Sequence, residues 1–223
     1  ANNASINDAN ALAVTTATTA NDLTLTSAGT GALILNEAIV GRDLNLNSAG
    51  DLTLSSGGQA VDVTTNLTAI SLGTIKQQGT ASTLKVGGIT QLTARNGTVD
   101  KDITLNNNTN ECAAVDIVNA LNVSIKDIAG SLALSGDMSG ALSVISLETN
   151  TILGTIITNP SELNVGGVAA FTVQNGQSIN LGNAANTFGG QPVFNGLIQD
   201  LTISDDSALT LQNGLNLSGN LIA

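Results

Sequence analysis

Five aspartates directly precede short segments of strand-like sequence: Asp22, Asp43, Asp51, Asp102 and Asp200. A row of carboxylates along one edge of a repeat protein could bind calcium. Calcium-binding β-rolls, however, use a Gly-Gly-x-Gly-x-Asp pattern, and the nearest segment, Gly57–Asp62, lacks its third glycine. Aspartate also accepts hydrogen bonds from backbone N–H groups at turns. We therefore predict a structural role for these side chains and no metal-binding residues.

Two pairs of carboxylates could act as the acid and base of a glycosidase or lyase, namely Asp205 with Asp206 and Asp100 with Asp102. Sugar clefts usually stack rings on Trp or Tyr, and proton transfer often uses His. The chain contains none of these three residue types. Cys112, the single cysteine, lacks a histidine partner for the same reason. We expect no enzyme, no catalytic residue and no cofactor, with a polysaccharide-active β-helix enzyme as the alternative.

The elements that would position these side chains are short strands. Asp22-Leu-Thr-Leu-Thr-Ser-Ala-Gly29 is followed by Asp43-Leu-Asn-Leu-Asn-Ser-Ala-Gly50 and at once by Asp51-Leu-Thr-Leu-Ser-Ser-Gly-Gly58. Strict alternation predicts strands with the leucines buried and Thr24, Asn45 and Thr53 outward. The small residues and glycines that follow suit turns. The step from the first copy to the second, about 20 residues, is typical of a solenoid.

A longer repeat overlies the short one. Residues 82–97 match residues 161–176 at eight of sixteen positions. We predict a single β-solenoid over residues 1–223 with a super-repeat of about 79 residues, comprising 82–160 and a partial copy at 161–223. At about 20 residues per rung, each super-repeat should span four rungs and the whole chain roughly eleven.

The repeats resemble those of the filamentous-haemagglutinin-like adhesins, which are very large secreted bacterial surface proteins. The similarity is carried by Leu163–Gly176, Ser178–Gly190 and the Asp-Leu-Thr-Leu copies. It implies an all-β fold, a right-handed parallel β-helix used as a stalk or adhesive rod. It also implies secretion and display on the bacterial cell surface.

Composition agrees with a narrow aliphatic core. Hydrophobic residues make up 42% of the 223 residues and aromatic residues only 1%. Phe171, Phe188 and Phe194 fall close together, where they could line an adhesive groove or fill a wider part of the core. An array of outward threonines, begun by Thr24 and Thr26, could bind ice, but the next copy carries asparagines there.

Charge limits the partners. The net charge is −11, and the six basic residues are scattered, so we expect no nucleic-acid binding and no membrane insertion. The pattern continues to the last residue without a polar cap. Exposed strand edges would favour either flanking repeats of a longer chain or end-to-end self-association. A receptor or glycan on a host cell or neighbouring cell is the other expected partner.

Overall fold

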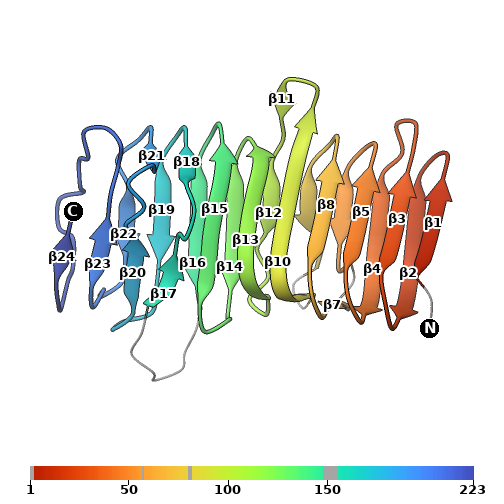
Figure 1. Ribbon diagram of the computed structural model, residues 1–223, viewed down its shortest axis with the longest axis horizontal. Coiled ribbons are helices and arrows are strands. Elements are labelled where there is room, and N and C mark those ends of the chain that lie inside the picture. The colour runs from red at the N-terminus through yellow and green to blue at the C-terminus, as the bar shows by residue number, and fades with distance from the viewer. Residues whose placement is uncertain (1–2, 57, 80–81, 148–154) are drawn as a thin grey trace.

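The computed structural model describes residues 3–56, 58–79, 82–147 and 155–223. Over these residues the chain is all β, without a helix, and coils into a parallel β-solenoid (Figure 1). The amino-terminal strand lies at one end of the rod and the carboxy-terminal strand at the other. No helix long and apolar enough to cross a membrane occurs among these residues. The predicted parallel β-helix is thus confirmed.

Every turn but the last, between β23 and β24, contributes a strand to each of three faces, which we number in chain order. Long strands bend around a corner and belong to two faces. Face 1 stacks the start of β2 (Leu12–Thr19), the start of β4 (Leu33–Val40), β6 (Leu52–Leu54), β9 (Ile75–Gln77), β12 (Ile103–Leu105), β14 (Val123–Asp127), β16 (Leu142–Ser146), β19 (Ala169–Thr172) and β22 (Val193–Asn195).

The other two faces are assembled in the same way. Face 2 stacks the ends of β2 and β4, then β7 (Ala60–Val63), the starts of β10 (Thr83–Asn96), β13 (Glu111–Ala120) and β15 (Leu132–Met138), and β17 (Thr155–Thr158), β20 (Ser178–Leu181), β23 (Leu201–Ile203) and β24 (Leu221–Ile222). Face 3 stacks β1 (Ala4–Asp8), β3 (Leu23–Ser27), β5 (Leu44–Ser48), β8 (Leu67–Ser71), the ends of β10, β13 and β15, β18 (Leu163–Val165) and β21 (Thr187–Phe188).

The rod has about nine turns, so the predicted eleven is wrong. Most turns are longer than the expected rung of about 20 residues. On face 1, for example, Leu52 pairs with Ile75 in the next turn, and Ile75 pairs with Ile103 in the turn after that. The longest of these turns, from Ile75 to Ile103, includes a hairpin that β10 makes with β11 (Val99–Asp100). This hairpin projects from the rod (Figure 1). It turns at Asn96-Gly97, where the glycine has a φ of 59°.

The leucines of the three Asp-Leu copies line the core as predicted. All six, Leu23, Leu25, Leu44, Leu46, Leu52 and Leu54, are at most 2% exposed. Thr24 and Asn45 lie on the outer surface and are partly exposed. Thr53 was also predicted outward, but it is only 5% exposed. It pairs with Ile34 on one side and Lys76 on the other, and these longer side chains flank it.

The third Asp-Leu copy lies on a different face from the first two. Leu23 and Leu25 stack directly on Leu44 and Leu46 within face 3. The copy beginning at Asp51 turns the next corner, and its strand β6 stacks on β4 in face 1. Copies of this motif are therefore spaced in two ways, a whole turn from Asp22 to Asp43 and a single face from Asp43 to Asp51.

The long repeat also changes face from one copy to the next. Leu84 lies on face 2, where it pairs with Val61, but its counterpart Leu163 lies on face 3, where it pairs with Gly136. Ten strand positions separate the two, which is three turns and one further face. The predicted four rungs per super-repeat is thus wrong. Each copy advances by one face around the rod axis relative to the copy before it.

Deleting residues 82–160 tests this rotation. We expect the sequence around Leu163 to take the place of the start of β10 on face 2. Asn164 would then lie beside Asp62, as Lys85 does in the intact chain. A double variant Asp62→Cys/Asn164→Cys in the deleted chain should form a disulfide, because paired strands bring Cα atoms within disulfide range.

Two matched measurements complete the test. Ile70→Cys/Asn164→Cys in the same deleted chain should not cross-link, because Ile70 belongs to face 3. In the full chain carrying Cys112→Ser, neither pair should cross-link, since more than three turns separate the members. A disulfide from Ile70, or loss of the strand signal in circular dichroism, would contradict the rotation.

Candidate functional site

The aspartates at the corners accept hydrogen bonds from the following turn. Asp43 Oδ1 accepts from both the backbone N–H and the side-chain amide of Asn66, each at 3.1 Å. Asp102 and Asp200 accept the same two bonds from Asn122 and Asn220. The predicted structural role at the strand entrance is confirmed for these residues, because each carboxylate satisfies donors that a corner would otherwise leave unpaired.

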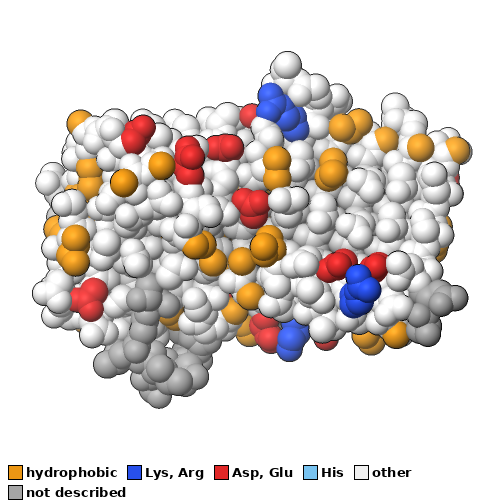
Figure 2. Space-filling model, viewed as in Figure 1, with side chains coloured by type: hydrophobic (Ala, Val, Ile, Leu, Met, Phe, Trp, Pro, Cys, Tyr) orange, Lys and Arg blue, Asp and Glu red, His pale blue; other side chains and the backbone are white. Residues whose placement is uncertain are grey.

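Charged groups elsewhere in the described residues form no larger acidic cluster. No three His, Cys, Asp or Glu side chains there gather in a way that could hold a metal ion. Four ion pairs link basic side chains to acids, at Arg42–Asp22, Lys76–Asp51, Lys85–Glu111 and Arg95–Asp100. The basic partner is at least 37% exposed in each pair, so the pairs contribute little stability. Charged side chains are few and scattered on the face in Figure 2.

Three of the four suspected catalytic carboxylates, Asp100, Asp102 and Asp205, bind different polar partners. Asp100 accepts from Ser139 and faces Arg95, whereas Asp102 accepts from Asn122. Asp205 accepts from the N–H and hydroxyl of Ser207 within a local turn.

Cys112 is 1% exposed, and burial raises the pKa of its thiol to about 12. It is therefore protonated at neutral pH and unsuited to act as a nucleophile.

The three phenylalanines fill the core, which settles the two interpretations of their clustering. Phe171, Phe188 and Phe194 are 0%, 8% and 3% exposed. The rings of Phe171 and Phe194 stack at 5.6 Å between centroids. The outward threonines form no continuous array either, since Thr24 is followed by Asn45 and Thr26 by Asn47 and then Ile70.

Two buried asparagines, Asn110 and Asn186, each bond through the side-chain amide to two separate backbone segments at a corner. We call each such set of contacts an asparagine bracket. These brackets were not predicted from the sequence. The side-chain amide of Asn110 donates to the carbonyl of Leu105 at 3.1 Å, and its Oδ1 accepts the backbone N–H of Leu84 at 3.1 Å. Asn186 makes the corresponding contacts with Leu181 and Leu163. Their spacing could have predicted them, because in each super-repeat an asparagine lies five positions after a strand leucine.

A second missed feature is a ladder of inward serines. Ser27, Ser48 and Ser71 pair in register at the ends of β3, β5 and β8, and each is at most 4% exposed. Their hydroxyls donate to backbone carbonyls at the corner, for example Ser71 to Gly50 at 2.7 Å. Ser27 and Ser48 were predicted to lie in turns, whereas all three serines lie inside the rod and bond to the backbone there.

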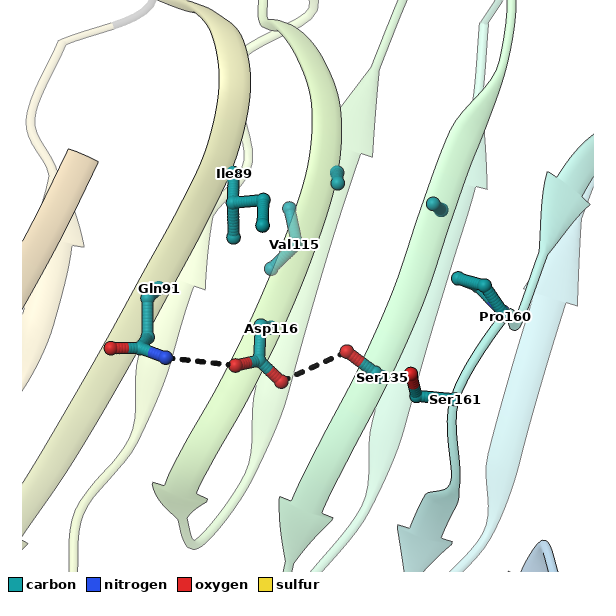
Figure 3. A pocket seen from close by; sticks show the side chains of 9 residues that line it. Ile89, Gln91, Val115, Asp116, Ser135, Pro160 and Ser161 are labelled. Carbon is teal, nitrogen blue, oxygen red and sulfur yellow. Dashed lines mark hydrogen bonds between the residues drawn. The ribbon is translucent and has the colours of Figure 1, made fainter. Parts of the chain in front are cut away.

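A groove of about 260 Å³ lies over β10, β13 and β15 (Figure 3). Gln91, Asp116 and Ser135 are paired neighbours along one side. Asp116 accepts from Gln91 at 3.0 Å and from Ser135 at 2.8 Å. The floor contains Ala114 and Ala133, which are also paired neighbours.

The groove is hollow because small residues are flanked by larger ones. Ile89 precedes the two alanines in the same stacked row, and Pro160 and Ser161 line the far end. A second, shallower hollow shares Ile89 and Gln91 and continues over Asn66, Leu67 and Thr68 of the preceding turn. Together they make one surface along the rod axis that we call the axial groove.

The family comparison matches the repeat structure. A family described as repeats of unknown function (DUF5649) matches residues 41–119 and 120–195, and the chain belongs to this family. Both matched units are close in length to the super-repeat. No curated protein matches the chain. No solved structure matches it.

The Asn110 bracket should be essential for stability. We expect Asn110→Leu to lower the free energy of unfolding by about 3 kcal/mol, because the N–H of Leu84 and the carbonyl of Leu105 lose their buried partner. Asn108→Leu is the matched control, since Asn108 belongs to the same turn but is exposed. Denaturant titration measures both variants. Equal stabilities would show that the bracket contributes nothing.

Asp51 should contribute to stability in a pH-dependent way. The backbone N–H of Thr74 is the largest cause that holds the pKa of Asp51 below its usual 3.8, and burial opposes it. A lowered folded-state pKa stabilises the protein above the unfolded-state pKa, and this contribution disappears as the pH falls through the folded-state value. We expect Asp51→Asn to flatten the loss of melting temperature between about pH 5 and pH 2. An acid profile identical to that of the wild type would contradict this assignment.

Proposed function

We propose that this chain is a segment of an extracellular structural rod. It would serve as the stalk or adhesive part of a bacterial surface adhesin, or as a unit of a self-assembling surface filament. The observation that carries this proposal is the stack of faces, whose corner side chains are committed to backbone hydrogen bonds. The polar side chains at the corners stabilise the turns through hydrogen bonds to the backbone, as those of Asp43, Asp102, Asn110 and Asn186 do.

The resemblance to filamentous-haemagglutinin-like repeats supports the same proposal, although the matching family is described only as repeats of unknown function. Stacked solenoid turns contact only their neighbours, so a rod lengthens by adding units without changing its core. Flanking repeats or a second copy placed end to end are the partners that suit such an architecture. A secreted, cell-surface location follows from the proposed role.

A polysaccharide-active enzyme is the second candidate, and the axial groove is the observation that favours it. Hydrolysis of a glycosidic bond usually needs two carboxylates on opposite sides of the bond. Asp116 is the only carboxylate among the described residues that line the groove. We therefore assign the groove to binding and not to cleavage, and propose that the chain is not an enzyme.

Cell labelling tests the proposed role. Antibodies against the folded solenoid should label intact cells of the bacterium that encodes it, without permeabilisation. Deletion of the coding region should remove the label and reduce attachment to surfaces. Labelling that requires permeabilisation would contradict a surface rod, and release of reducing sugar from polysaccharides by the purified chain would favour the enzyme.

A further inference from the structure

We propose that the axial groove binds a neutral, extended glycan strand lying parallel to the rod. The biological setting of this inference rests on the proposed surface role, but the argument for the ligand rests on the groove itself. Four features of the groove support the proposal: a row of polar side chains, an apolar floor, a negative charge, and strands whose edges are already paired.

The polar row repeats at the spacing of the turns. Thr68, Gln91, Asp116 and Ser135 occupy one register position on four successive turns. Strand spacing places neighbouring members about 4.8 Å apart, so the row extends about 14 Å along the axis. A pyranose unit of an extended glycan has a similar length, so successive sugars can meet successive side chains. An extended peptide, at about 3.3 Å per residue, does not match this spacing.

The side chains of this row suit hydroxyl groups. The hydroxyls of Thr68 and Ser135 both donate and accept, the amide of Gln91 does the same through two atoms, and the carboxylate of Asp116 accepts. A hydrogen bond to a charged acceptor is stronger than one between neutral groups. Beside this row, Ala114 and Ala133 leave room for the apolar face of a sugar ring between Ile89 and Pro160.

Charge excludes other classes of polymer. None of the described residues lining either part of the groove is Lys or Arg, and Asp116 places a negative charge at its centre. Nucleic acids and anionic polysaccharides would meet repulsion without a compensating cation. A neutral glycan avoids this cost.

The backbone argues against a peptide that binds by strand addition. That mode needs a free strand edge. Here β10 pairs with β7 and β8 on one side and with β13 on the other, and β13 also pairs with β15. Along β10 and β13 the groove therefore offers side chains and no free strand edge. Without aromatic rings the affinity should be weak, with a dissociation constant on the order of 1 mM for a single site.

Nuclear magnetic resonance titration of the full chain tests the proposal. The probes are the neutral hexasaccharides cellohexaose, laminarihexaose and maltohexaose, and the anionic control is hexagalacturonate. We expect at least one neutral probe to shift the amide signals of Gln91, Asp116 and Ser135 saturably. Hexagalacturonate should bind at least tenfold more weakly.

Three variants locate the site. Ala133→Trp fills the floor and should weaken binding at least tenfold, and Asp116→Ala should weaken it at least fivefold. Ala170→Trp is the matched control, because Ala170 occupies the position of Gln91 in the following super-repeat and lies on the partly exposed side of β19. This variant should bind as the wild type does. Circular dichroism confirms that each variant is folded.

Several outcomes would overturn the proposal. They are the absence of shifts with all three neutral probes at about 10 mM, binding that Ala133→Trp leaves intact, and tighter binding of hexagalacturonate. Groove signals that shift on dilution without sugar would identify a contact between copies and would also overturn it. None of these results affects cell-surface labelling, so failure of the glycan site is distinguishable from failure of the surface role.

Discussion

The structure depends on the backbone hydrogen bonds that run along the rod axis from each turn to the next. In a solenoid every strand must find its partners one turn below and one turn above, so adjacent turns must match in register on all three faces. Leu23 pairs with Leu44 and Leu44 with Leu67, and the buried leucines follow the same axis. The register that pairs the backbone hydrogen bonds is thus the same register that stacks the leucines on one another.

Corners are where this constraint is hardest to meet, because a bending strand loses its ladder partners. The side chains at the corners replace them. Asp43 supports Asn66, Asn110 supports Leu84, and the serine ladder donates to carbonyls inside the coil. A composition poor in charge and rich in Asn, Ser, Thr and Gly follows from this need for short neutral groups that reach the backbone. The axial groove then arises on the outer surface, where stacking alone fixes which side chains lie side by side.

Much of the fold could be predicted from the sequence, because two-residue alternation and recurrence are local signals. The inward leucines of the three Asp-Leu copies are the clearest example. The number of turns could not, since a turn closes only after three faces, and sequence identity does not reveal which face a copy occupies. Leu84 and Leu163 show this directly. The axial groove was missed because it depends on pairing between residues such as Ala114 and Ala133 in different turns.

Amide hydrogen exchange along the whole chain tests the stacking most directly. If axial ladders on three faces hold the rod together, strands β4, β5 and β6, which between them cover all three faces, should all be strongly protected. Protection should decline only toward β1 and β24, the outermost strands of the stack. Rapid exchange along one entire face in the middle of the rod would contradict the three-faced solenoid.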